Sequence, residues 1–284
     1  MKGFSVENEL TAYIEHPRKL HFAALAIMVA TLLAMAASYV SGAYASLPPV
    51  AVAFMVLWLV LAILAFAALP RVSFVPAYLV SLLCMLVSWR IAGLHGVDLV
   101  IYSLLVAFLI YLAMFGLIAW RSVHHEDPKL KLDRTDWHET LIRIYIGFDL
   151  VPHFTEKLFA GPGPRNEDIK SFIELGVPAP EFFVTLAGFC ELGIAIGIGL
   201  GLLTRLAAVC SALYFMIATI LGHHFFLGFI WASPGGGWEY PVLMIVLLIS
   251  FLLDGAGPFS IDNVILRRLT PPTWVRRLMV PPRD

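Results

Sequence analysis

The 284-residue sequence has little charge for its length. Only 14% of its residues are Asp, Glu, Lys or Arg, against about 25% in a typical soluble domain, and 60% are hydrophobic. This shortage of charge excludes an ordinary soluble domain and indicates an integral membrane protein. The net charge of −1 excludes the strong basic field with which proteins bind nucleic acid, so we expect no nucleic-acid partner.

Cysteine is also scarce, and the spacing of the three cysteines does not match a metal-binding motif. Cys84, Cys190 and Cys210 all lie in apolar stretches, and none has the C-x-x-C or other spacing of a metal ligand set. We read them as small hydrophobic residues. The chain carries no flavin motif, and no predicted helix has the H-x-x-x-H spacing of a metal site, so we expect neither a flavin nor a bound metal.

Long apolar runs, in contrast, are abundant. A helix needs about 20 mostly apolar residues to cross the hydrocarbon core of a bilayer. The runs of this kind are residues 22–41, 50–69, 75–93, 98–120, 139–158, 181–203, 206–229 and 238–254. The sequence therefore predicts an all-α, polytopic membrane protein with eight transmembrane helices. No cleavable signal peptide precedes them, so we expect the first helix to stay as an anchor.

Lys and Arg are distributed unevenly between the predicted connections. They gather in the segments that share a side with the N-terminus, so the positive-inside rule predicts that both termini are cytoplasmic. We expect a multi-pass protein of a bacterial inner (plasma) membrane. The expected domains are an N-terminal four-helix membrane region at 1–120, a cytoplasmic linker at 121–137, a second four-helix membrane domain at 138–265 and a basic cytoplasmic tail at 266–284.

The predicted outer connection between the fifth and sixth spans is long. Within it, residues 167–176 read "EDIKSFIELG", with apolar residues at helical spacing, acids at the start and a glycine at the end. This pattern is typical of a short amphipathic helix at the membrane interface. An ordered loop is the alternative.

Ionisable residues interrupt the predicted spans of the second half. Each costs about 2.5–3.5 kcal/mol at the centre of a membrane helix, and such residues usually face the interior of a bundle. Asp149, His153 and Glu156 or Lys157 recur at intervals of three and four, so they share one face of the fifth helix. Glu191 falls near the middle of the sixth span.

We predict one polar pocket built by His153, Glu191, one of His223 and His224, and Glu239. Only one of the adjacent histidines should face it, because neighbouring residues on a helix point about 100° apart. The other candidate site residues are Arg143, Asp149, Lys157 and Trp238. The alternative is mutual pairing, in which Arg143 or Lys157 meets a carboxylate and locks two helices together.

A quinone headgroup fits this residue set better than a metal ion. It requires hydrogen-bond donors, a titratable group and aromatic walls, which Phe154, Phe183, Phe225, Phe226 and Trp238 could provide. In helix six, Gly193, Gly197 and Gly201 form a face for close helix contact, with Glu191 projecting roughly opposite.

The second half also carries motifs in a recognisable order. They are "R-x-x-x-G" at 143–147, "EKLF" at 156–159, "ELGVPAPEFF" at 174–183, "GFCELGIAIGIGLGLLTRLAA" at 188–208, the histidines of the seventh span and "GGGWEYPVLMIVLLISFLLDGAGPFSID" at 235–262. Over residues 138–262 this order resembles the DoxX family of four-helix bacterial membrane proteins. The positions that match the polar pattern of the family are Arg143, Lys157, Glu191, Arg205, Glu239 and Asp262.

The resemblance implies a four-helix membrane fold and, for the chemistry, two alternatives. Characterised members include the membrane subunit of a thiosulfate:quinone oxidoreductase, and others resemble scaffolds that gather partner proteins. We therefore expect a membrane subunit for quinone-linked oxidation of a small, possibly sulfur-containing donor.

In that role His153 and His223 or His224 would handle protons or the quinone, and Glu191 would hold or relay a proton because burial disfavours its charged form. A non-catalytic scaffold or accessory subunit is the alternative, and a small-solute or proton transporter is a third. Membrane lipid and partner subunits are the expected partners.

Overall fold

The computed structural model describes residues 17–125 and 132–281, and within these ranges the chain is helical and contains no strand. Part of the expected linker, at 126–131, and both chain ends lie outside the described residues. The chain divides into two compact units. The first comprises residues 1–141 with 159–161 and 267–269, and the second comprises 142–158, 162–266 and 270–284.

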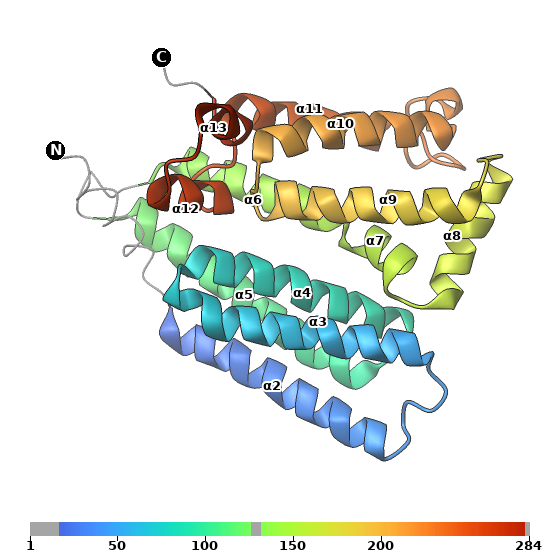
Figure 1. Cartoon of the computed structure of the whole chain (residues 1–284), viewed down its shortest axis with the longest axis horizontal. Coiled ribbons are helices and arrows are strands. Elements are labelled where there is room, and N and C mark those ends of the chain that lie inside the picture. Colours follow the sequence, from blue (N-terminus) through green and yellow to red (C-terminus); the bar gives the residue numbers. More distant parts are fainter. Residues whose placement is uncertain (1–16, 126–131, 282–284) are drawn as a thin grey trace. The chain divides into compact units, whose positions relative to one another are not determined.

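Four long helices form the first unit (Figure 1): α2 (Arg18–Val40), α3 (Pro49–Ala68), α4 (Phe74–Leu94) and α5 (Asp98–Val123), with a 3₁₀ turn η1 (Leu69–Arg71) after α3. Their boundaries follow from local sequence. Pro49 begins α3, where its missing N–H has no intrahelical partner to lose. Ser73 caps α4 by accepting a hydrogen bond from the Val75 N–H.

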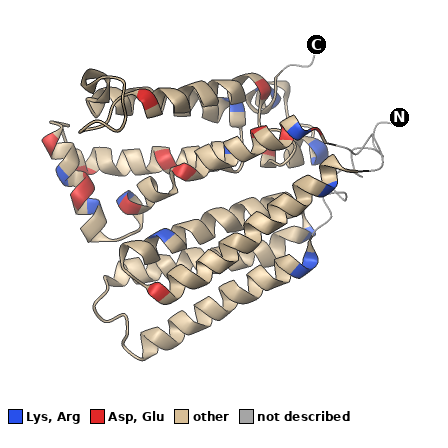
Figure 2. Cartoon of the chain, turned by 180° about the vertical axis from the view of Figure 1, so that it is seen from behind, with Lys and Arg blue, Asp and Glu red and all other residues tan. Residues whose placement is uncertain are grey.

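Hydroxyl groups join the helices of this unit. The Tyr78 hydroxyl donates to the Tyr111 carbonyl at 2.8 Å, and the Ser81 and Ser88 hydroxyls donate to the α3 carbonyls of Ala62 and Met55 at 2.7 and 2.8 Å. Such bonds hold membrane helices together where lipid offers no polar partner. Charged residues of this unit lie towards the helix ends, whereas the second unit also carries them along its helices (Figure 2).

The second unit contains shorter and more irregular elements. α6 (Arg134–Asp149) starts in the first unit and continues into the second. The other elements of the second unit are α7 (Val151–Leu158), α8 (Pro162–Glu174), α9 (Pro180–Ile194), a π-helical turn η2 (Ala195–Gly199), α10 (Thr204–Leu221), a 3₁₀ turn η3 (His224–Leu227), α11 (Glu239–Asp254), α12 (Ile261–Arg268) and α13 (Thr273–Met279). The segment expected to be a basic tail, 266–284, contains the end of α12 and the whole of α13.

Six helices of the described chain are long and apolar enough to cross a membrane: α2, α3 with η1, α4, α5, α9 with η2, and α10. The expected fifth and eighth spans are not among them. Residues 139–158 are broken at Leu150, because Pro152 lacks the N–H that would continue the helix. α11 has 16 residues, which rise about 24 Å, less than the roughly 30 Å of the hydrocarbon core.

The expected seventh span, 206–229, extends beyond the end of the observed helix. α10 ends at Leu221, and His223 then adopts a left-handed φ of 60°, which stops the helix. His223 and His224 therefore follow the helix instead of lying on it, and the prediction that they point about 100° apart on one helix is wrong.

The expected amphipathic helix is present as α8. Pro162 occupies its start, and Gly176, just after its end, has a φ of +72°, which a glycine adopts without strain. The helix reading of residues 167–176 is therefore confirmed over the loop reading.

A close backbone approach in the second unit joins α6 to η2. A Cβ atom added to Gly147 would lie 2.1 Å from the Gly199 nitrogen, and one added to Gly199 would lie 2.4 Å from the Phe148 ring. Gly193, by contrast, has open space beside it. The contact face predicted at Gly193, Gly197 and Gly201 is therefore wrong at Gly193, because the π-turn shifts the close approach to Gly199.

We expect Gly199→Ala to lower the free energy of unfolding by about 3 kcal/mol or more, because its methyl group would overlap α6. Gly193→Ala, in the same stretch of glycines, should leave it within about 0.5 kcal/mol of the parent. Titration of the purified proteins from mild detergent into sodium dodecyl sulfate measures both. Equal stability of the two variants would contradict the close approach.

Candidate functional site

Arg143 is fully buried in α6 and is held by backbone carbonyls. One terminal nitrogen donates to the carbonyls of Ile198 and Gly199, at 2.5 and 2.7 Å, and the other donates to the carbonyl of Phe259 at 2.6 Å. The π-turn η2 supplies two of these acceptors. The described hydrogen bonds of Arg143 thus go to carbonyls, where the sequence suggested a carboxylate, and they anchor the helices.

Asp262 organises the same end of the second unit. Its carboxylate accepts hydrogen bonds from the Leu203 N–H, the Thr204 N–H and the Thr204 hydroxyl at 2.7–2.9 Å. Burial raises the pKa of Asp262, and these hydrogen bonds together with the charge of Arg143 oppose that rise. Asp262 therefore caps the start of α10.

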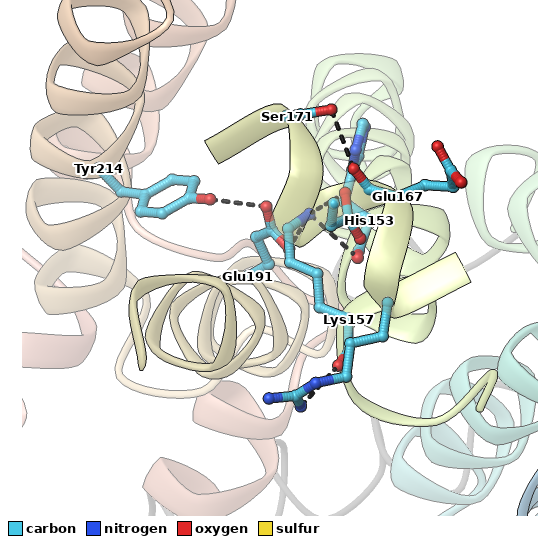
Figure 3. A network of polar contacts seen from close by, with 8 residues as sticks. His153, Lys157, Glu167, Ser171, Glu191 and Tyr214 are labelled. Carbon is cyan, nitrogen blue, oxygen red and sulfur yellow. Dashed lines mark hydrogen bonds and ion pairs between the residues drawn. The ribbon is translucent and has the colours of Figure 1, made fainter. Parts of the chain in front are cut away.

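A second polar cluster joins α7, α9 and α10 (Figure 3). The Lys157 ammonium lies 3.2 Å from Glu191 Oε2, and the Tyr214 hydroxyl donates to Glu191 Oε1 at 2.6 Å. Both members of the ion pair are buried, with 7% of each side chain exposed. Lys157 also donates to the His153 carbonyl at 3.2 Å. The Lys157 ammonium, the Glu191 carboxylate and the Tyr214 phenol therefore form a continuous series of contacts between the three helices.

A glycine allows α7 to reach α9. A Cβ atom at Gly188 would lie 2.8 Å from the Leu158 side chain and 3.1 Å from Lys157 Cβ. Gly188 lies three residues before Glu191, so both are on one face of α9. The break at Pro152 starts α7 as a separate helix, and Gly188 lets its lysine approach the glutamate.

The amphipathic helix α8 contributes the outermost members of the cluster. Asp168 Oδ1 lies 4.0 Å from Lys157 Nζ. Arg165 donates to the Lys157 carbonyl at 3.4 Å and to the Thr185 hydroxyl at 2.9 Å. Burial raises the pKa of Asp168; Lys157 and His153 oppose the rise, and the carboxylates of Glu156 and Glu191 add to it.

The other candidate residues have separate partners. The His153 side chain is exposed, and its backbone carbonyl is what Lys157 contacts. Asp149 accepts a hydrogen bond from the Tyr240 hydroxyl. His224 Nδ1 lies 2.9 Å from the Gly235 carbonyl.

Glu239 accepts a hydrogen bond from the Trp231 N–H at 3.1 Å, and Trp238 packs against Phe225 and Phe229. Of the four side chains predicted to share one pocket, Glu191 is in the described cluster and Glu239 is bonded to the loop after α10. No described hydrogen bond links His223, His224 or Glu239 to Glu191.

Sequence reasoning missed Tyr214, Asp168 and Arg165. Tyr214 was hidden because tyrosine is common in apolar spans, and only its position opposite Glu191 distinguishes it. Asp168 and Arg165 belong to the predicted connection, where charge is ordinary. Among the described residues, no group of three His, Cys, Asp or Glu side chains is placed to hold a metal ion.

These features define a helical membrane protein whose second half encloses a buried ion pair. The family model DoxX matches residues 139–224. The matched region contains Arg143, Lys157, Glu191 and Tyr214, and it ends before α11. No curated protein and no solved structure gave a match.

We expect Lys157→Met to lower the free energy of unfolding by about 3–5 kcal/mol, because it leaves Glu191 buried without its cation. The double variant Lys157→Met/Glu191→Met should recover part of the loss, since both charges are then removed together. Lys170→Met, on the exposed side of α8, is the matched control and should have little effect. Detergent-to-dodecyl-sulfate titration measures all three; additive effects of the two single changes would contradict a direct pair.

Proposed function

We propose that this protein is the membrane subunit of a quinone-linked oxidoreductase that acts on a small, possibly sulfur-containing donor. The cluster of Tyr214, Glu191, Lys157 and Asp168 is the part of the DoxX domain that would exchange protons as the quinone changes redox state. Oxidation or reduction of a quinone moves protons together with electrons, and tyrosine, glutamate and lysine can hold and pass protons.

One observation carries this proposal: a phenol, two carboxyl groups and an ammonium, all groups that can take up or release a proton, follow one another inside the domain. Glu191 and Asp168 both lie near Lys157, and the described hydrogen bonds of Arg165 go to neutral oxygens. Because these groups lie in series, a proton taken up at one of them can pass to the next, which makes the cluster a store for an exchangeable proton.

The residues fit a quinone headgroup in part. Tyr214 and Lys157 are suitable donors to a quinone carbonyl, yet each already contacts Glu191. A bound headgroup would therefore replace one of these contacts. The quinone supplies the electron-accepting chemistry; the chain supplies the donors and the proton site.

A second candidate is a non-catalytic scaffold or accessory subunit. The mutual pairing of Lys157, Glu191 and Tyr214 favours it, because a satisfied polar network can serve only to fix helix positions. The carbonyl-bound Arg143 is a structural device of this kind. The two candidates differ in whether the domain retains a quinone.

We expect the protein purified in mild detergent to retain quinone, detected by solvent extraction and ultraviolet difference spectra on borohydride reduction. Glu191→Gln should lower the retained amount about tenfold, corresponding to about 1.4 kcal/mol of binding free energy. Glu181→Gln, also on α9, is the matched control and should retain the parental amount. Absence of quinone from the parent protein, with stability intact, would favour the scaffold.

We also propose that α6 with α7 forms a fifth crossing and α11 an eighth, in a bacterial inner membrane with both termini cytoplasmic. The kinked α6–α7 pair covers residues 134–158, and α11 begins and ends at acidic residues, Glu239 and Asp254. Buried partners for Arg143 and Lys157 make charges in such a crossing tolerable.

In a variant free of its three cysteines, we expect Asn166→Cys to react with a membrane-impermeant maleimide in intact spheroplasts. Thr135→Cys and Thr270→Cys should react only after lysis, because they lie on the opposite side. All three positions are exposed. Labelling of Asn166→Cys and Thr135→Cys from the same side would contradict a fifth crossing.

A further inference from the structure

The cluster around Glu191 runs from the interior of the second unit to the amphipathic helix α8. Its successive contacts are Tyr214 hydroxyl to Glu191 at 2.6 Å, Glu191 to Lys157 at 3.2 Å and Lys157 to Asp168 at 4.0 Å. The exposed fraction of the side chain is 7% at Glu191 and at Lys157 and 23% at Asp168, and Tyr214 is also half-buried. Of the two carboxyl groups, Asp168 is therefore the one nearer to water.

Asp168 has an unused hydrogen-bonding atom. Its Oδ2 is enclosed and has no hydrogen-bond partner, and Glu191 Oε2 meets Lys157 as an ion pair without forming a hydrogen bond of good geometry. An enclosed carboxylate oxygen with no donor is costly as an anion, whereas a protonated oxygen can donate. The Asp168 carboxyl group thus offers a place for a proton.

Every element packed around Asp168 presents a titratable group to it. α7 contributes His153, Glu156 and Lys157, α9 contributes Glu191, and α10 contributes Tyr214 through its contact with Glu191. Lys157 is the charged group that lies between the two carboxyls. A proton leaving Glu191 towards α8 therefore meets Lys157 first.

We propose that Asp168 is the port through which Glu191 exchanges protons with the aqueous phase at the α8 end of the domain, with Lys157 as the intermediate carrier. This inference rests on the proposed function, in which the quinone reaction delivers or consumes these protons. It adds the route and its outermost residue.

The transfer step conserves atoms and charge. Lys157 Nζ first gives one of its three protons to Asp168 Oδ1, and the lone pair of the resulting amine then takes the proton of protonated Glu191. Glu191 ends as a carboxylate, Lys157 is still an ammonium and Asp168 ends as a neutral acid, which then releases its proton to water. Rotation about the flexible lysine side chain closes the 4.0 Å between Nζ and Oδ1.

α8 is held in the position that this route needs. Arg165, one turn before Asp168, bonds to the Lys157 carbonyl on α7 and to the Thr185 hydroxyl on α9. The port is therefore a fixed part of the domain, because the same helix that carries Asp168 is fastened to both helices of the ion pair.

The test measures proton exchange at Glu191 in the full-length protein in lipid nanodiscs. Infrared difference spectra after a switch from H₂O to D₂O follow the C=O band of protonated carboxyl groups, and the band lost in Glu191→Gln identifies Glu191. We expect Asp168→Asn to slow deuteration of that band by about 100-fold, the lower end of what one positioned acid–base group contributes. Glu167→Gln, the exposed neighbour on α8, should match the parent rate.

The direction of the change separates a port from a merely structural residue. Loss of a structural contact would loosen α8, admit water and speed exchange, whereas loss of a port slows it. Asp168→Glu should restore fast exchange. Unchanged or faster exchange in Asp168→Asn overturns the proposal, as does absence of a protonated Glu191 band in the parent from about pH 5 to about pH 8.

Failure of this inference is distinguishable from failure of the proposed function. Asp168→Asn should retain as much quinone as the parent protein, because the change leaves the Lys157, Glu191 and Tyr214 contacts in place. Slow exchange with normal quinone retention supports the port. Normal exchange with normal retention leaves the quinone site standing and removes the port.

Discussion

The second half of the molecule depends on one constraint: a charge among apolar helices must find its partner inside the protein. Lipid provides neither counter-charges nor hydrogen bonds. Lys157 meets this constraint with Glu191 from another helix, and Glu191 uses its second oxygen to accept from Tyr214. Each contact ties together elements that are distant in the sequence, so the ion pair fixes the positions of α7, α9 and α10.

The constraint is met differently at Arg143. The two terminal nitrogens of its guanidinium donate to three carbonyl groups, two of them from the π-turn η2. The cation thus fastens this irregular turn to α6. The partners of Arg143 are backbone carbonyl dipoles, which do not gain or lose protons. The partners of Glu191 are titratable side chains, so the two clusters differ in the chemistry that they can perform.

Small residues and a proline make both arrangements possible. Gly147 and Gly199 let α6 approach η2, and Gly188 lets α7 approach α9. Pro152 separates α7 from α6, so that the face carrying Lys157 is free to turn towards α9. In the first unit, serine and tyrosine hydroxyls perform the joining role without charge, and its helices are correspondingly regular.

The sequence by itself determined the helical class, the position of the first four spans, the amphipathic helix α8 and the DoxX resemblance. These features depend on apolar run length and local pattern, which act within one element. It also marked Arg143, Lys157 and Glu191 as out of place in apolar helices. It placed His223 and His224 on the seventh helix, although α10 ends at Leu221. The positive φ of His223, which stops the helix, cannot be recognised from the residue type.

Only the tertiary structure decided which polar groups meet. Residue types at helical spacing show which side chains share a face, but the partner of that face depends on kinks and glycine contacts between helices far apart in the chain. Pairing therefore joined Glu191 to Lys157 and Tyr214, and brought Asp168 close to Lys157, while the His153 side chain remained exposed. Helix formation is local, whereas satisfaction of a buried charge requires contacts that the fold alone creates.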